Sequence, residues 1–249
     1  MVMAMDILGY LLMFGGGTLA GIINTLAGGG SMITLPILMF YGLPADVANG
    51  TNRIAILLQN VVGVSSFERK GVKSLKISLP LGIVATFGAV IGSFIAVDLN
   101  EDLLNKVIGI ILVIMVIFVI KKPKVSKNVN GTGLKIFKYI AFFGLGIYGG
   151  FIQAGIGFLL ITAITFFIGT DLIKTNAIKV GIVLIYTCAS LIIFFYNGLV
   201  NVPLGIMLAL GNMTGAYLAV KLAISKGIKF LKIFLIAVVV INAIRAFLF

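Results

Sequence analysis

A run of three glycines, flanked by polar residues, interrupts an otherwise apolar segment near the N-terminus. Residues 7–45 carry no charged side chain, yet the glycines at 28–30 lie inside them, between Asn24 and Ser31. Each glycine weakens a helix by about 1 kcal/mol relative to alanine, and lipid cannot hydrogen-bond the backbone of a broken helix. Free N–H groups at the start of the next helix favour a bound anion. The break therefore predicts an anion-binding position along a path through a membrane.

Two cations lie within apolar helices, Arg53 in the first half of the chain and Lys179 in the second. A cation inside a membrane is costly, and it implies a polar partner or a polar path. The guanidinium group of Arg53 could hold an oxyanion through two parallel hydrogen bonds, and Lys179 could add a point charge. The alternative for each is that its side chain reaches out to the membrane surface. Their nearly symmetric positions in the two halves favour a binding site.

The composition indicates the class of protein that must position these residues. The chain is 61% hydrophobic and 10% charged, whereas soluble proteins carry about 25% charged residues. It also contains several apolar segments long enough to span a bilayer. We therefore predict an all-α integral membrane protein. The net charge of +12 follows from cations in short loops beside the apolar spans, as membrane topology requires, and it does not indicate nucleic-acid binding.

The sequence offers few groups for catalysis. It contains no histidine and a single cysteine, Cys188, which excludes histidine-based zinc sites, Ser-His hydrolysis and thiolate metal clusters. No Asp or Glu lies in the middle of an apolar span, so no carboxylate proton relay is visible. We predict no enzyme activity and no cofactor or metal. Proton coupling would have to use other groups or the protonation of the substrate, and association into a homo-oligomer is left open.

The second half of the chain repeats the first at a constant offset of 127 residues. Two apolar sequences rarely match by chance at two glycine breaks and at an Asn one turn into the same helix, so the match indicates an internal duplication. The aligned positions are 27–30 with 154–157, Gly42 with Gly169, Asn49 with Asn176, and Asn52 with Lys179. We predict a first membrane repeat at 1–121, a cytoplasmic linker at 122–135 and a second membrane repeat at 136–249.

Charge placement orients the two repeats, each of about 120 residues. If each broken segment enters the membrane and returns on the same side, each repeat has three further spanning helices and the two repeats are inverted. The basic loops 68–76 and 221–229 and the basic linker 121–138 then face the cytoplasm, as the positive-inside rule requires. The acidic loop at 98–102 and the loop at 197–198 then lie outside. The alternative has four spans per repeat and parallel halves; the length of 7–24 supports it, but it places 221–229 outside.

The sequence also predicts the helices of the first half and the structural roles of several further residues along the chain. The expected helices cover 7–24, 32–41, 46–67, 77–97 and 103–120, of which the second is too short to span a membrane alone. Asp46 and Asp171 are interpreted as helix caps rather than proton carriers. Close packing of helices accounts for Gly82, Gly88 and Gly92. Hydrogen bonds between helices account for Gln59, Asn60, Asn212 and Asn242.

Four stretches of the first half together resemble the TauE/SafE family of sulfite exporters and toluene-sulfonate uptake permeases: 21–31, 34–36, 42–44 and 48–53. The resemblance extends over essentially the whole chain, although the second break, at 154–157, matches the family pattern less closely. It implies a multi-pass permease of the cytoplasmic membrane that moves sulfite, sulfonates or other small organic anions, in either direction. Carried over residue by residue, it implies a pathway at Asn24, Gly28, Gly29, Gly30, Ser31, Asn49, Asn52 and Arg53.

The sequence thus predicts a secondary carrier for a small, sulfur-containing anion in the lipid bilayer. An anion channel, a carrier for small carboxylates, an intramembrane enzyme and a structural subunit are the alternatives. No Gly-rich nucleotide-binding motif occurs, so no nucleotide-driven step is expected within the chain. The predicted substrate-binding residues are Asn24, Thr25, Gly28, Gly29, Gly30, Ser31, Asn49, Asn52, Arg53, Gln153, Gly155, Gly157, Asn176 and Lys179.

Overall fold

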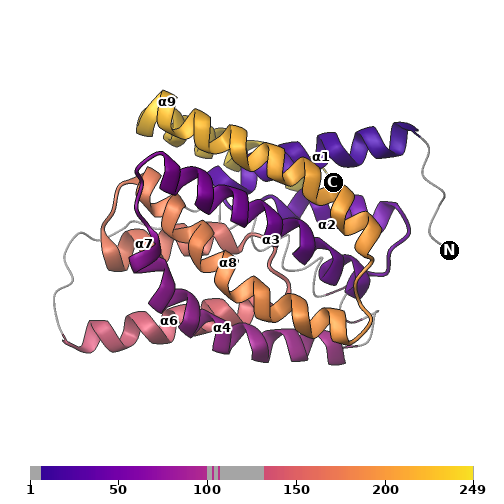
Figure 1. The fold of residues 1–249 in the computed structure, drawn as a ribbon, viewed down its shortest axis with the longest axis horizontal. Helices are drawn as coiled ribbons and strands as arrows, with labels where there is room; N and C mark the ends of the chain where they lie inside the picture. Colours follow the sequence, from indigo (N-terminus) through magenta and orange to yellow (C-terminus); the bar gives the residue numbers. More distant parts are fainter. Residues whose placement is uncertain (1–6, 100–102, 104–105, 107–131, 249) are drawn as a thin grey trace.

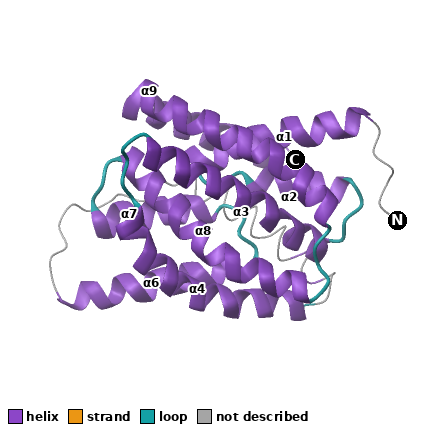
Figure 2. Ribbon diagram, in the orientation of Figure 1, coloured by secondary structure: helices purple, strands orange, loops and turns teal. Residues whose placement is uncertain are grey.

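The computed structural model describes residues 7–99, 103, 106 and 132–248, and these residues form helices joined by short loops (Figure 1, Figure 2). No strand occurs in these ranges, which confirms the all-α class. The helices are α1 (Ile7–Leu26), α2 (Ser31–Phe40), α3 (Ala45–Arg69), α4 (Leu75–Asp98), α6 (Thr132–Phe151), α7 (Ile156–Ile168), α8 (Leu172–Tyr196) and α9 (Val202–Leu248). Most of the expected span at 103–120, most of the linker at 122–135 and the side chain of Asn242 lie outside the described part of the chain.

Within the described ranges, four helices are long and apolar enough to cross a membrane. The apolar segments are Gly9–Leu26, Leu75–Asp98, Leu172–Tyr196 and Val202–Gly227. Helix α3 is as long as α8, at 25 residues each, but it buries many polar side chains, including Asn52, Arg53 and Gln59. Lipid cannot satisfy such groups. Helix α3 therefore packs centrally, between α8 and α9.

The helices form three layers, with α1 and α9 in one outer layer, α3 and α8 in the middle, and α4 and α6 in the other outer layer (Figure 1). Glycines bring the outer helices into close contact. A Cβ atom at Gly92 of α4 would lie 1.9 Å from the carbonyl oxygen of Ile147 on α6, and one at Gly88 would lie 2.1 Å from that of Phe143. These contacts confirm the close-packing interpretation of Gly88 and Gly92.

Each glycine-broken segment folds back on itself as a helical hairpin. In the first hairpin, the hydroxyl of Tyr41, just after α2, donates to the carbonyl of Gly9 near the start of α1, at 3.2 Å. In the second hairpin, the ring of Phe167 near the end of α7 lies 5.9 Å from that of Phe137 near the start of α6. The return helices have 10 and 13 residues, or about 15 and 20 Å. Neither return helix could cross a hydrocarbon core of about 30 Å.

The two hairpins enter the bundle from opposite ends, with α2 at one end of the layers and α7 at the other (Figure 1). The first hairpin packs along α9 of the second half, and the second hairpin packs along α4 of the first half. Each half therefore supplies the helix against which the hairpin of the other half rests.

Some helix ends differ from the sequence-based expectation. Asp171 does cap α8, because its carboxylate accepts hydrogen bonds from the N–H groups of Ile173 and Lys174 at 2.9 and 3.0 Å. The expected cap at Asp46 is wrong. Helix α3 begins at Ala45 after Pro44, so Asp46 already lies in the first turn, and it accepts only from the adjacent N–H of Val47.

The basic loop expected at 221–229 is shorter in the structure, where two helices meet at a single glycine. Both helices are included in α9, and between them Gly227 departs from helical geometry, with φ 72° and ψ −172°. Apolar residues continue on both sides of the segment, so a helix interrupted at one glycine satisfies more backbone hydrogen bonds than an open loop would.

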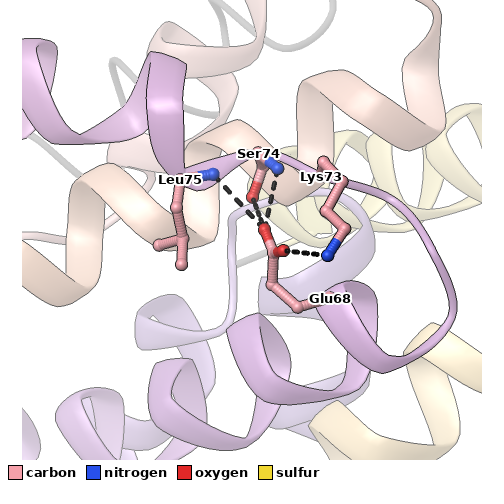
Figure 3. A network of polar contacts seen from close by, with 4 residues as sticks. All are labelled: Glu68, Lys73, Ser74 and Leu75. Carbon is pink, nitrogen blue, oxygen red and sulfur yellow. Dashed lines mark hydrogen bonds and ion pairs between the residues drawn. The ribbon is translucent and has the colours of Figure 1, made fainter.

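Glu68 joins the end of α3 to the start of α4 (Figure 3). Its Oε1 accepts hydrogen bonds from the N–H groups of Ser74 and Leu75 at 2.8 and 3.3 Å, and its Oε2 lies 3.9 Å from Nζ of Lys73. These donors, above all the N–H of Ser74, stabilise the ionised carboxylate and hold the pKa of Glu68 below its usual value of 4.5. Glu68 therefore caps the N-terminus of α4.

Replacing Glu68 with glutamine is expected to lower the free energy of unfolding by about 1 kcal/mol, the usual contribution of a helix cap. Because the pKa is lower in the folded chain, the stabilisation is full above pH 4.5 and is lost as the pH falls through the folded pKa. Thermal unfolding at neutral and acid pH measures the difference between variant and parent. Lys73→Gln is the control, because its exposed ion pair contributes little. An equal loss in that control would assign the effect to the ion pair.

Candidate functional site

The tips of the two hairpins touch at the centre of the bundle. The N–H of Gly157 donates to the carbonyl of Gly28 at 3.2 Å. A Cβ atom built on either glycine would lie 2.2 Å from the Cα of the other. Gly28 also has a φ of 94°, which L side chains rarely adopt. Glycine is therefore required at both positions by the contact between the hairpins.

Backbone N–H groups without partners lie at both tips. The amides of Gly29 and Gly30, at the start of α2, make no hydrogen bond within the described ranges, and neither do those of Ala154 and Gly155, at the start of α7. All four residues are buried. Buried N–H groups are nearly always paired with protein or a bound group, and the positive end of a helix attracts anions. The tips thus present two sets of donors suited to an oxyanion.

Lys179 of α8 binds the end of α1. Its ammonium donates three hydrogen bonds, each of 2.8 Å, to the carbonyl oxygens of Asn24 and Thr25 and to Oδ1 of Asn176. The side chain is 2% exposed. The last carbonyls of a helix have no partner within the helix and carry partial negative charge. Lys179 therefore neutralises the C-terminal end of the first hairpin's entering helix.

Arg53 of α3 does the same for α6. Its guanidinium donates to the carbonyl oxygens of Gly149, Gly150 and Phe151 at 3.2, 2.6 and 3.3 Å, and it lies 4.3 Å from the ring centroid of Phe194. The neighbouring Asn49 adds a hydrogen bond of 2.7 Å to Phe151. Each hairpin is thus held by a buried cation from the central helix of the other half.

Asn52 of α3 holds the start of α2. Its Nδ2 donates to Oγ of Ser31 at 3.2 Å, and its Oδ1 accepts from Oγ1 of Thr34 at 2.7 Å. All three side chains are buried. Thr34 was not among the predicted residues, although it lies one turn after Ser31 on the same helix. This group fixes the angle at which α2 leaves the break.

A small cavity lined by polar and apolar side chains lies beside Gly157, with a volume of about 10 Å³, close to the smallest space that can hold one water molecule. Gln153 lines it with a φ of 65°, a strained conformation typical of functional sites. Its Nε2 donates to the hydroxyls of Tyr186 and Thr187 at 3.3 and 2.8 Å, and its Oε1 has no partner. The lining residues are Asn24, Ile56, Asn60, Gln153, Ile156, Gly157, Lys179 and Val183.

Further polar atoms without partners are buried in this region. They include Nε2 of Gln59, Nδ2 of Asn176 and Oγ1 of Thr25. Oε1 of Gln59 accepts from Nδ2 of both Asn24 and Asn212, each at 3.2 Å. These bonds confirm that Gln59 and Asn212 form hydrogen bonds between helices, as expected.

The structure sorts the predicted site residues into three groups. The cavity brings together Asn24, Gln153, Gly157 and Lys179, with Thr25, Gly28, Gly29, Gly30, Gly155 and Asn176 beside it or at the tips. Ser31 begins α2, and Asn52 of α3 contacts it there. Asn49 and Arg53, also of α3, contact the end of α6. The prediction missed Asn60 as a cavity residue, and it missed Tyr186 and Thr187. The offset of 127 aligns Gln59 and Asn60 with Tyr186 and Thr187, a signal that could have found them.

Comparison with known proteins assigns the family. A family model described as sulfite exporter TauE/SafE matches residues 13–246. The chain is 27% identical to a probable membrane transporter protein, ORF9, of Sinorhizobium sp., over 91% of this chain and 88% of that protein. It is 28% identical to the probable membrane transporter protein YfcA of Escherichia coli strain K12, over 86% and 80%. No solved structure matches the chain. The sequence-based resemblance is thereby confirmed: the chain belongs to the sulfite exporter TauE/SafE family of membrane transporters.

Proposed function

We propose that this transporter is a secondary carrier for a small anion: sulfite, a sulfonate or another sulfur-containing organic anion. The observation that carries the proposal is the pair of hairpin tips, which meet with unpartnered N–H groups on both sides. The three oxygens of a sulfite or sulfonate group could accept hydrogen bonds from both tips at once. The sulfur-containing class follows from the family description, because backbone donors alone also suit carboxylates.

Arg53 and Lys179 supply positive potential to this site rather than direct contacts. Each cation is bound to backbone carbonyls, whose partial charges offset a full charge only in part. Among the described residues, no carboxylate forms an ion pair with Arg53 or Lys179. Lys179 also lines the cavity. An anion between the tips would therefore be stabilised by two buried cations that are already held in place.

The closed contact between the tips favours a carrier over an open channel. A cavity of about 10 Å³ is far below the roughly 300 Å³ of typical ligand sites. We infer that the anion enters when the contact between Gly157 and Gly28 opens. We infer that the hairpins separate on one side at a time, so that the site faces each side of the membrane in turn.

We further propose that the two halves are inverted repeats and that the hairpins are re-entrant segments of a multi-pass protein in the cytoplasmic membrane. The hairpins enter from opposite ends (Figure 1), and the return helices are too short to span. Arg69, Lys70 and Lys221 line one cavity, which agrees with two of the basic segments facing the same side. That this side is the cytoplasm stays a prediction from the positive-inside rule.

Flux through reconstituted protein tests the proposal. Purified protein in liposomes is offered sulfite, sulfate, thiosulfate, sulfoacetate and small carboxylates, with and without a proton gradient. Saturable uptake that exchanges with unlabelled anion on the other side supports a carrier, and stimulation by the gradient would reveal proton coupling. Ohmic single-channel current would show a channel instead. Absence of transport and of binding for every anion would overturn the proposal.

Asn60→Ala is expected to raise the KM for the transported anion by about tenfold, equivalent to about 1.4 kcal/mol of binding energy. The free energy of unfolding is expected to change by less than about 1 kcal/mol. Asn60 lines the cavity, and its Nδ2 bonds only to the carbonyl of Ile56 in its own helix, at 2.7 Å. Asn197→Ala is the matched control, because Nδ2 of Asn197 makes the same kind of bond to Ile193, at 2.8 Å, away from the site. Equal KM values in both variants would remove Asn60 from the site.

A further inference from the structure

A second, much larger cavity lies on the outer surface, between the last turns of α3 and the middle of α9. Its volume is about 570 Å³. Val61 and Tyr217 on its walls are 44% and 56% exposed, so the groove is open along its length. The residues of this surface groove are Val61, Val62, Ser65, Ser66, Arg69, Lys70, Tyr217, Val220 and Lys221.

The surface groove changes character along its length. Arg69 and Lys70 end α3, and Lys221 faces them from α9. Val61 lies eight residues before Arg69 on the same helix, which is about 12 Å along the axis. The groove therefore has a cationic end and an apolar end, and their separation is most of the roughly 15 Å hydrocarbon thickness of one membrane leaflet.

The cations of the surface groove have no anionic partner in the described part of the chain. The nearest acidic residue in sequence, Glu68, is occupied by the N–H groups of Ser74 and Leu75 and by Lys73 (Figure 3). Three like charges around one cavity repel one another unless an anion lies between them. The hydroxyls of Ser65 and Ser66, one turn before the cations, are further donors for such an anion.

We propose that the surface groove binds an anionic phospholipid, with the phosphate on Arg69, Lys70 and Lys221 and an acyl chain along the valines. A soluble anion would satisfy only the cationic end and would leave the apolar end exposed. A lipid satisfies both, and basic pockets between helices on the cytoplasmic side are suited to anionic head groups. The groove is formed by α3 of one half and α9 of the other, so a bound lipid would tie the two halves together.

Lipid retention tests this proposal independently of transport. The full chain is reconstituted in nanodiscs of phosphatidylcholine alone or mixed with phosphatidylglycerol, then extracted, and the lipids it retains are identified by native mass spectrometry. The test variant carries Arg69→Gln, Lys70→Gln and Lys221→Gln. The control variant carries Lys76→Gln, Lys174→Gln and Lys226→Gln, which remove the same charge outside the groove.

The parent and the control are expected to retain phosphatidylglycerol in preference to phosphatidylcholine. In the test variant, this preference is expected to fall by a factor of at least about ten. Equal retention by the test variant and the parent would overturn the proposal. An equal loss in the control would too, because it would show an effect of total charge. Displacement of the lipid by inorganic phosphate or by the transported anion would identify the groove as a site for soluble anions and would also overturn it.

Discussion

Replacing Arg53 with alanine is expected to lower the free energy of unfolding by about 3 kcal/mol or more, because it removes charged hydrogen bonds to buried carbonyls and leaves a cavity. The side chain is fully buried and binds the carbonyls of Gly149, Gly150 and Phe151. Ser93 and Asn49 would still serve two of those oxygens, but Gly149 would lose its side-chain donor. Thermal unfolding in detergent, with the yield of monodisperse protein, measures the loss.

Arg53→Lys separates this capping role from direct anion binding. Lys179 holds the end of α1 with a single ammonium, so a lysine at 53 is expected to restore much of the lost stability. If Arg53 instead gripped the anion with its guanidinium fork, Arg53→Ala would fold as stably as the parent, and Arg53→Lys would bind the anion weakly. That pair of results would contradict the capping role.

Gly157→Ala is expected to reduce transport by at least about tenfold, or about 1.4 kcal/mol, and to destabilise the protein by about 1–3 kcal/mol, as overpacking does. The new methyl group would lie 2.2 Å from the Cα of Gly28, a backbone atom that cannot rotate away. The tips would be forced apart, and the hydrogen bond from Gly157 to Gly28 would be lost. Flux in liposomes and thermal unfolding measure the two effects.

Gly144→Ala is the matched control for Gly157→Ala. Gly144 also lies in a helix, α6, but a Cβ atom built on it meets no described residue within 4 Å. This substitution is expected to leave transport unchanged and to stabilise the helix by up to about 1 kcal/mol. Parental transport in Gly157→Ala would show that the tips do not need to touch, and the proposed opening of that contact would then be wrong.

Arg53 and Lys179 show most clearly what the sequence could predict and what required the structure. Their cost in an apolar setting predicted that Arg53 and Lys179 must have polar partners, and both are indeed buried with such partners. The sequence predicts an anionic substrate near these cations, and the contacts that the structure shows are with helix ends, 96 residues away for Gly149 and 155 for Asn24. Such distant pairs are not encoded in local spacing.

By itself, the sequence determined the membrane class, the family and the two glycine breaks, because composition, periodicity and glycine cost are local properties. Only the tertiary structure decided that the breaks touch at Gly28 and Gly157, that each half caps the hairpin of the other, and that Asn60 and Gln153 share a cavity. The physical reason is that these contacts join segments far apart in the chain, and packing, rather than any local preference, brings them together.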